Sequence, residues 1–169
     1  IPVAVYDHIQ FNIFASSKFI EETYNEEKPK ILEKYASMGY RDAQIEKDSV
    51  YVLSPNLVNI VIKVKEGKQY YFRDISFIGN TKYTNAELAK VLGIKKGEIF
   101  NQSKLDSRLF MNPSGYDISS LYMDDGYLFF NINPVEINVE NDSIDLEIRI
   151  YEGKQATINK VMVTGNDKT

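Results

Sequence analysis

The chain contains an internal repeat. Glu66-Gly67-Lys68-Gln69 recurs as Glu152-Gly153-Lys154-Gln155, and Gly79-Asn80 recurs as Gly165-Asn166, each displaced by 86 residues (152 − 66 and 165 − 79). A constant displacement over separate segments indicates duplicated folding units. The fold of the whole chain therefore reduces to the fold of one repeat length.

The repeat predicts three segments. Residues 1–68 would form a unit that lacks its first strand, residues 69–155 a complete unit, and residues 156–169 the first strand of a third unit. Gly39-Tyr40 aligns with Gly126-Tyr127 at a displacement of 87 instead of 86. The second copy therefore has one extra residue before this motif and one fewer after it. Because the same spacing would start the first unit before Ile1, we expect the sequence to be part of a longer tandem array.

Composition narrows the function classes. With 43% apolar and 26% charged residues, the chain lies near the average of globular proteins. It has no cysteine, which excludes disulfide frameworks and thiolate metal sites. A net charge of −4 argues against nucleic-acid binding, which gains most of its affinity from Lys and Arg contacts to phosphates. No apolar run approaches the roughly 18 residues needed to cross a bilayer.

The complete unit is predicted to run strand, helix, helix, strand, strand. Residues 70–77 are aromatic and β-branched, and the helix that follows should start at Thr84, with Glu87 completing a capping box. Gly93 is a natural end for that first helix. The segment Asn112-Pro113-Ser114-Gly115 should break the second helix, because proline removes a ladder donor and clashes with the preceding turn.

The last two strands show which face of the sheet is buried. Residues 144–150 alternate strictly between apolar and polar, which is typical of a sheet with one buried face. The preceding strand changes phase across Asn133-Pro134, so a bulge or a break is needed to bury Ile132 together with Ile137 and Val139. A similar shift occurs after Ile45. The predicted fold is α+β, with tandem β-α-α-β-β units, each a three-stranded sheet covered on one face by two helices.

Three motifs recur in this order. Tyr-x-x-x-Gly-Tyr closes the second helix at residues 35–40 and 122–127, Glu-Gly follows the last strand, and Gly-Asn follows the first strand. The unit resembles POTRA domains, and the stretch 124–130 is similar to that region in the BamA family of outer-membrane assembly factors. The resemblance covers nearly the whole chain and implies tandem POTRA units.

The resemblance implies a location and partners. Such units lie in the periplasm, attached to the outer membrane through a C-terminal membrane β-barrel that this sequence lacks. They receive unfolded outer-membrane protein precursors and dock outer-membrane lipoproteins of the assembly complex. The implied binding mode is β-augmentation, in which an exposed strand edge pairs with an incoming extended segment.

The candidate site residues belong to two edges and two hinges. Proline lacks a ladder donor, so Pro134 places its strand at a sheet edge. The candidate edge residues are Tyr127, Leu128, Phe129, Phe130, Asn131, Ile132 and Asn133, with Ala43, Gln44 and Ile45 in the first unit. The candidate inter-domain hinges are Glu66-Gly67 and Glu152-Gly153.

No catalytic, cofactor or metal site is predicted. His8 is the only histidine, and Asp124-Asp125 has no third ligand at coordinating spacing. The alternatives are a POTRA scaffold of another system, such as a two-partner secretion transporter or a cell-division protein, and a KH-like nucleic-acid-binding module. A KH module needs a Gly-x-x-Gly loop, and no two glycines here are three residues apart.

The isolated strand at the C-terminal end suggests one further partner. Residues 156–163 have the pattern of an opening strand without a unit to complete. They could pair with the incomplete first unit of a second copy, giving a strand-swapped self-association.

Overall fold

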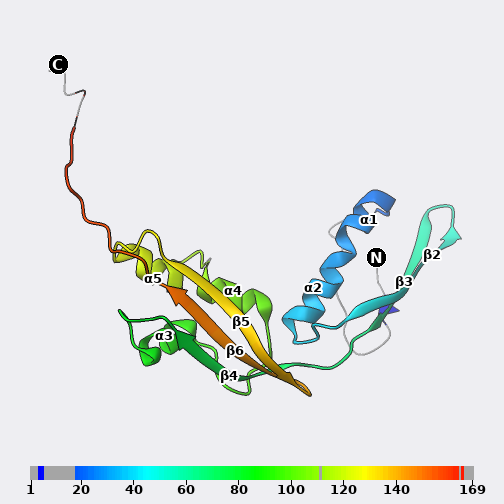
Figure 1. The fold of residues 1–169 in the computed structure, drawn as a ribbon. Coiled ribbons are helices and arrows are strands. Elements are labelled where there is room, and N and C mark those ends of the chain that lie inside the picture. Colours follow the sequence, from blue (N-terminus) through cyan, green and yellow to red (C-terminus); the bar gives the residue numbers. More distant parts are fainter. Residues whose placement is uncertain (1–3, 6–17, 111, 164, 166–169) are drawn as a thin grey trace. The chain divides into compact units, whose positions relative to one another are not determined.

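The computed structural model describes residues 4, 5, 18–110, 112–163 and 165 of the chain (Figure 1). Within these residues the fold is α+β, as predicted. The elements, in chain order, are β1 Ala4–Val5, α1 Glu21–Glu27, α2 Pro29–Ser37, β2 Gln44–Ser54, β3 Leu57–Lys65, β4 Tyr71–Ile78, α3 Asn85–Leu92, α4 Gln102–Leu109, α5 Ile118–Asp124, β5 Asn131–Glu140 and β6 Ser143–Tyr151.

The strands form two three-stranded sheets with the same order. One sheet has the order β1-β3-β2 and the other β4-β6-β5, so in each the last strand is central and the middle strand of the sequence is terminal. β1 pairs in parallel with β3, with Ala4 opposite Val61, and β2 pairs antiparallel with β3. The sheet of β2 and β3 therefore carries a two-residue strand where the repeat predicted that an opening strand would be missing.

Helices α1 and α2 cover one face of the sheet formed by β2 and β3. The apolar side chains of both layers meet in one buried cluster: Tyr24, Ile31, Tyr35, Ile60, Ile62 and Val64. Pro29 occupies the first turn of α2. Proline is tolerated there because the N–H groups of a first turn make no hydrogen bond within the helix. The cluster consists of side chains from α1 and α2 and the inward-facing residues of β3. These side chains exclude solvent from one face of the sheet.

The predicted alternation of β6 is confirmed. Ile144, Leu146, Ile148 and Ile150 are all buried, and the residues between them are more exposed. The start of α3 is also as predicted, because the Thr84 side chain accepts a hydrogen bond from the Glu87 N–H and the Glu87 carboxylate accepts one from the Thr84 N–H. These local signals place both elements within a residue of their predicted bounds.

The second helix is broken as predicted, into α4 and α5. Asp117 caps α5, and its carboxylate accepts hydrogen bonds from Ser120 N at 2.9 Å and from Asn112 N at 3.2 Å. Only 2% of Asp117 is exposed. The break is thus held by a buried carboxylate that satisfies N–H groups on both of its sides.

Tyr122 of α5 is the centre of an aromatic cluster. Its ring stacks on Phe130 with centroids 4.2 Å apart and meets Tyr83 edge-on at 4.9 Å. A second edge contact joins it to Tyr127 at 5.8 Å. Aromatic pairs in these geometries add to the stabilisation that comes from burial alone.

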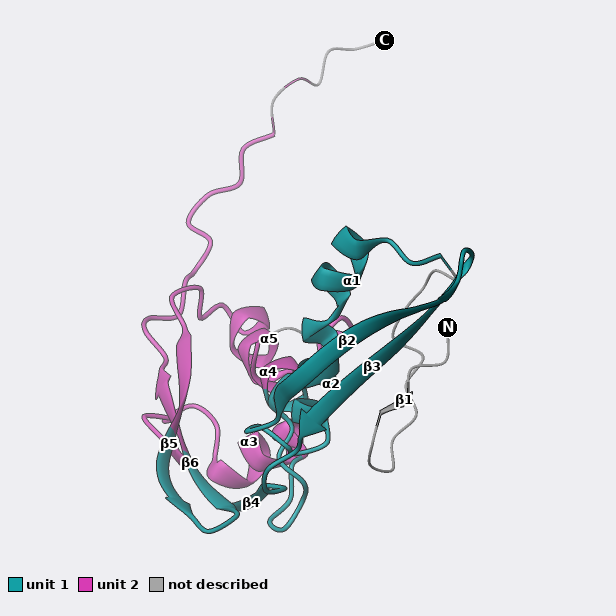
Figure 2. Cartoon of the chain, turned by 90° about the vertical axis from the view of Figure 1, so that its right-hand side faces the viewer, with its two compact units in different colours: residues 1–75, 94–105, 136–146 teal, residues 76–93, 106–135, 147–169 magenta. Residues whose placement is uncertain are grey.

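The chain divides into two compact units (Figure 2). Unit 1 comprises residues 1–75, 94–105 and 136–146, and unit 2 comprises residues 76–93, 106–135 and 147–169. This division crosses strands β4, β5 and β6, whereas the repeat predicts boundaries after residues 68 and 155. The repeat boundaries stay predictions.

Residues 156–163 form neither a helix nor a strand. The segment contains the two most exposed large apolar side chains of the described residues, Ile158 and Val163, each 85% accessible. The opening strand predicted for this segment is therefore not formed in the single chain.

Candidate protein-interaction site

The two terminal strands, β2 and β5, each have an edge that no described strand covers. Such an edge presents unpaired N–H and C=O groups, to which an extended segment can bind. Gln44 and Ile45 begin β2, and Asn131, Ile132 and Asn133 begin β5. The structure thus places half of the predicted edge residues on terminal strands.

The other predicted edge residues lie before the strands. Tyr127, Leu128, Phe129 and Phe130 form a turn, in which Leu128 N donates to Gly126 O and Phe130 N donates to Tyr127 O. Ala43 immediately precedes β2 and donates its N–H to Tyr40 O at 3.2 Å. The prediction of strand from residue 127 was wrong, because the turn that closes α5 continues for four residues past Gly126.

The pairing of β2 with β3 is irregular at both ends. The register shifts between Ile45 and Lys47, which confirms the bulge predicted after Ile45, and again between Val52 and Ser54. Between Lys47 and Val52 the partners follow one another without a shift. Because a bulge locally disrupts a ladder, this central run is the part of β2 with a regular backbone edge.

The first half of β2 is charged and anchored. Asp48 accepts hydrogen bonds from Lys28 Nζ and from the Tyr24 hydroxyl, each at 3.0 Å, and Glu46 pairs with Lys63 of β3 at 2.7 Å. The bond from Lys28, assisted by that from Tyr24, holds the pKa of Asp48 below its ordinary value. These contacts fix β2 to α1 and β3.

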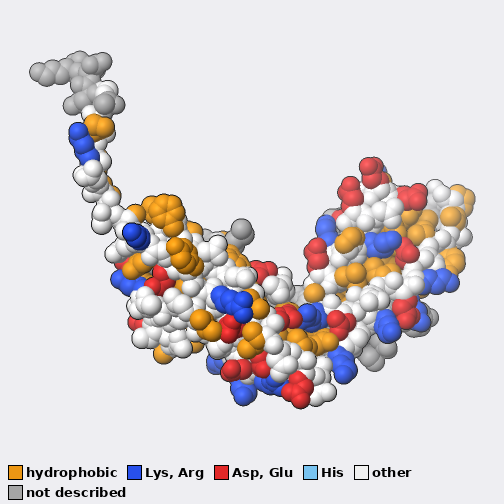
Figure 3. Space-filling model, viewed as in Figure 1, with side chains coloured by type: hydrophobic (Ala, Val, Ile, Leu, Met, Phe, Trp, Pro, Cys, Tyr) orange, Lys and Arg blue, Asp and Glu red, His pale blue; other side chains and the backbone are white. Residues whose placement is uncertain are grey.

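The second half of β2 is apolar and exposed. Tyr51, Val52 and Leu53 of β2 are 51%, 77% and 62% exposed, and Leu57, which opens β3, is 56% exposed. Figure 3 shows apolar side chains gathered over the β2–β3 hairpin. We call Tyr51, Val52, Leu53 and Leu57 the hairpin tip.

An open hollow lies on one face of β2 and β3. It has a volume of about 340 Å³ and is lined by Lys47, Ser49 and Tyr51 of β2 and by Val61 and Lys63 of β3. These residues alternate along the two strands, so they share one face of the sheet. The hollow therefore lies on the face of the β2–β3 pair.

The edge of β5 contains a proline. Pro134 supplies no N–H, and Ile137 and Val139, predicted to point inward, are 53% and 46% exposed. Since Ile132 points into the core and side chains alternate along a strand, the odd-numbered Ile137 and Val139 lie on the opposite face. The prediction that both apolar sets of this strand are buried was wrong.

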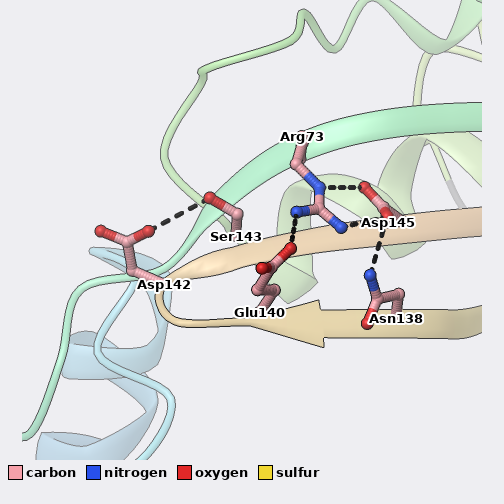
Figure 4. Close-up of polar contacts among 6 residues, drawn as sticks. All are labelled: Arg73, Asn138, Glu140, Asp142, Ser143 and Asp145. Carbon is pink, nitrogen blue, oxygen red and sulfur yellow. Dashed lines mark hydrogen bonds and ion pairs between the residues drawn. The ribbon is translucent and has the colours of Figure 1, made fainter.

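The end of the β5–β6 hairpin is braced by ion pairs (Figure 4). Arg73 of β4 donates Nε to Asp145 Oδ1 at 2.7 Å and Nη1 to Glu140 Oε2 at 2.6 Å, and its second terminal nitrogen also binds Asp145. Asn138 Nδ2 donates to the same carboxylate at 3.5 Å. The bidentate bond from Arg73 lowers the pKa of Asp145.

Glu152, one of the predicted hinge residues, is firmly bound. Its carboxylate accepts hydrogen bonds from Thr81 N at 2.7 Å, Lys82 N at 2.8 Å and the Tyr122 hydroxyl at 2.9 Å. Burial raises the pKa of Glu152, but the bonds from Thr81, Lys82 and Tyr122 outweigh it and the pKa lies below its ordinary value. No local sequence pattern predicts this anchor.

The two hinge glycines both adopt positive φ, +78° at Gly67 and +69° at Gly153. A Cβ at Gly67 would lie 3.2 Å from Asp42 Cβ, and one at Gly153 would lie 3.3 Å from Phe129 Cβ. Asp42 and Phe129 are themselves equivalent at the displacement of 87 (129 − 42). Glycine suits both positions because each has positive φ and lies against the equivalent neighbouring residue. The role of these glycines as hinges stays a prediction.

No helix of the described residues is long and apolar enough to span a membrane. Among the same residues, no three His, Cys, Asp or Glu side chains are grouped in a way that could hold a metal ion.

Comparison with known proteins gives one family. Residues 70–153 match the POTRA family, described as surface antigen variable number repeat. The outer membrane protein assembly factor BamA of Neisseria meningitidis serogroup B is 26% identical over 161 residues, covering 92% of this chain and 20% of the relative. BamA of Nitratidesulfovibrio vulgaris is 30% identical over 136 residues, covering 78% of this chain and 16% of the relative.

Solved structures agree on the fold. The crystal structure of Haemophilus influenzae BamA POTRA3-5 has a TM-score of 0.52 at 23% identity and covers 89% of this chain and 60% of that one. BamA from Haemophilus ducreyi lacking POTRA domains 1-3 has a TM-score of 0.51 at 19% identity, covering 78% of this chain and 23% of that one. The chain spans about a fifth of the length of the curated relatives it matches.

Proposed function

We propose, from the premise that this chain belongs to the POTRA family of BamA-type outer-membrane assembly factors, that it binds extended segments of unfolded outer-membrane protein precursors by strand addition. The principal edge is β2, and β5 is the second. Backbone pairing suits this task because clients that share strands need not share side chains.

The observation that carries the proposal is the terminal position of β2. Its run from Lys47 to Val52 combines a regular backbone with an edge that no strand of the described residues covers. The exposed hairpin tip supplies apolar contacts for alternate side chains of the added strand. β5 contains Pro134, which supplies no N–H, and two glutamates beyond it, Glu136 and Glu140.

The further partners of the proposal follow from the same family. The chain would lie in the periplasm, next to a membrane β-barrel of the same protein, and would dock outer-membrane lipoproteins of the assembly complex. The exposed segment 156–163 would displace β1 from its place beside β3 in a second copy, giving a strand-swapped self-association.

Chemical-shift mapping tests the principal edge. The chain is titrated with an extended peptide taken from a transmembrane strand of an outer-membrane barrel. We expect the largest amide shifts along residues 47–52 and smaller shifts along residues 131–133. Shifts dispersed over both sheets, or confined to α1 and α2, would reject strand addition.

Proline variants separate the two edges. Gln44→Pro and Asn131→Pro each place proline at the first residue of a terminal strand, where it is best tolerated by the sheet. Gln44→Ala and Asn131→Ala are the matched controls. Peptide binding that survives both proline variants and also survives Val52→Lys would count against the edges as the binding site.

A further inference from the structure

The turn that closes the second helix is built identically in both repeats. Tyr40 N donates to Tyr35 O and Tyr127 N donates to Tyr122 O, both at 3.0 Å. The paired tyrosine rings also meet edge-on in both places, with centroids 6.1 Å and 5.8 Å apart. The turn is therefore a duplicated structural element.

The chain that follows each last strand binds back to this turn through the same two hydrogen bonds. In the first joint, Gln69 Nε2 donates to Met38 O at 2.8 Å and Tyr70 N donates to Gly39 O at 2.9 Å. In the second joint, Gln155 Nε2 donates to Asp125 O at 2.7 Å and Ala156 N donates to Gly126 O at 2.8 Å. The donors are 86 residues apart (155 − 69) and the acceptors 87 (125 − 38).

The first joint is occupied by the loop before α4. Asn101 Nδ2 donates to Ser37 O at 2.9 Å, and Ile99 packs directly over Gly39, where a Cβ would lie only 2.7 Å from Ile99 Cγ2. Arg41 contributes charged contacts, because it pairs with Glu136 at 2.6 Å and lies 5.4 Å from the centroid of the Phe100 ring. Gly39 is buried as a result.

The second joint has the same backbone but an open, apolar surface. Leu128 and Phe129 stand where the first joint has Arg41 and Asp42, and they are 61% and 73% exposed. Met123, the counterpart of Ala36, is 48% exposed. Figure 3 shows apolar side chains gathered near the end of α5, where the C-terminal tail begins. We call Met123, Leu128 and Phe129 the α5 patch.

We propose that the α5 patch is the docking surface for a following unit of the same fold, one whose opening strand starts at Ala156. The first joint identifies the occupant, because the equivalent turn there receives the loop before the second helix of the next repeat. In place of a carboxylate for Arg41, this occupant must present apolar side chains to Leu128 and Phe129. The inference rests on the tandem arrangement assumed in the proposed function.

The test compares this chain with the natural sequence extended by one further repeat length. In each, Leu128→Ser with Phe129→Ser is set against Ile137→Ser with Val139→Ser, which removes exposed apolar side chains elsewhere. Hydrogen exchange of residues 123–130 is the readout. We expect the extension to slow this exchange by about tenfold or more, the α5-patch variant to remove that protection, and the control variant to keep it.

Three results would overturn the inference. The natural continuation could lack such a unit, the extension could leave exchange at the patch unchanged, or the α5-patch variant could abolish self-association of the present chain, which would assign the patch to a second copy. Titration with the barrel-strand peptide keeps this proposal separate from the proposed function. If the α5-patch variant loses peptide binding in the present chain, the patch binds the peptide and the docking inference fails. If only β2 variants lose peptide binding, the docking inference stands.

Discussion

The β2–β3 and β5–β6 hairpins hold the same place in their sheets, but their ends differ. The end of β5–β6 is tied to a third strand, because Arg73 binds both Glu140 and Asp145 next to the turn. The ion pairs of β2 lie further back, at Glu46 and Asp48, and its end is the apolar hairpin tip.

The difference shows that one topology can carry two kinds of edge. A braced, charged hairpin end protects a terminal strand from pairing with other chains, as negative charges and proline do in many sheets. An exposed apolar end with a regular backbone run behind it favours pairing. Under the proposed function, the β5–β6 hairpin would be mainly structural and the β2–β3 hairpin would be the main binding edge.

The largest effect is expected at Tyr122, under the start of β5. Tyr122→Ala removes a fully buried ring that stacks on Phe130 and should lower the free energy of unfolding by about 3–5 kcal/mol. Denaturant unfolding measures the loss. Tyr122→Phe, which removes only the hydroxyl that binds Glu152, should cost about 1–3 kcal/mol. If peptide binding to β2 weakened in parallel with this loss of stability, the proposed functional difference between the two hairpins would be contradicted.

The second effect concerns binding. Val52→Lys places a charge in the hairpin tip and should weaken binding of the barrel-strand peptide roughly threefold to tenfold, which corresponds to about 0.6–1.4 kcal/mol. Stability should change by less than about 0.5 kcal/mol, since Val52 is 77% exposed. Fluorescence anisotropy of a labelled peptide gives the affinity. Ile137→Lys is the matched change in β5, and an equal loss of affinity there would contradict the comparison.

A third prediction removes the brace. Arg73→Met keeps the aliphatic part of the side chain and removes its bonds to Glu140 and Asp145. Amide exchange at residues 138–145 should become several-fold faster, while exchange at residues 47–52 stays unchanged. Lys63→Met, which breaks the pair with Glu46, is the control and should leave residues 138–145 unaffected.

The smallest effect is a pH dependence of the same brace. The pKa of Asp145 is lowered, chiefly by its hydrogen bonds from Arg73, so the stabilisation is complete above the ordinary pKa of 3.8 and is lost as the pH falls through the lower folded value. Carboxyl-carbon NMR should show Asp145 titrating below 3.8 in the native chain and returning toward 3.8 in Arg73→Met. An unchanged midpoint in that variant would remove Arg73 as the cause.

Local sequence signals predicted the regular elements well. The capping box at Thr84, the alternation of residues 144–150 and the break at Pro113 each depend on neighbours a few residues apart, and the structure confirms all three. The terminal position of β5 also agrees with Pro134, because proline has no N–H to donate to a neighbouring strand and is found on edge strands. These features are decided by short-range physics, so a single sequence is enough to find them.

Features that depend on long-range contacts were missed. The turn at residues 127–130 has aromatic residues typical of a strand, but Gly153 lies close against Phe129 and the Phe130 ring stacks on Tyr122. Just before the turn, Gln155 donates to Asp125 O. The anchor at Glu152 was also missed, although Tyr122 and Glu152 both belong to motifs of the repeat. Their hydrogen bond joins segments 30 residues apart, which no local pattern reveals.

The buried carboxylate of Asp117 has a practical consequence. The Asp117 carboxylate caps α5 directly, so the start of this helix does not depend on the loop at residues 113–116. A Cβ at Gly115 in this loop would meet no atom within 4 Å. Exposed loop tips of this kind accept insertions with little change in stability. A fluorophore or a short tag placed there would leave the carboxylate, both hairpins and the α5 patch untouched. This loop therefore offers a reporter position for peptide-binding experiments on the intact chain.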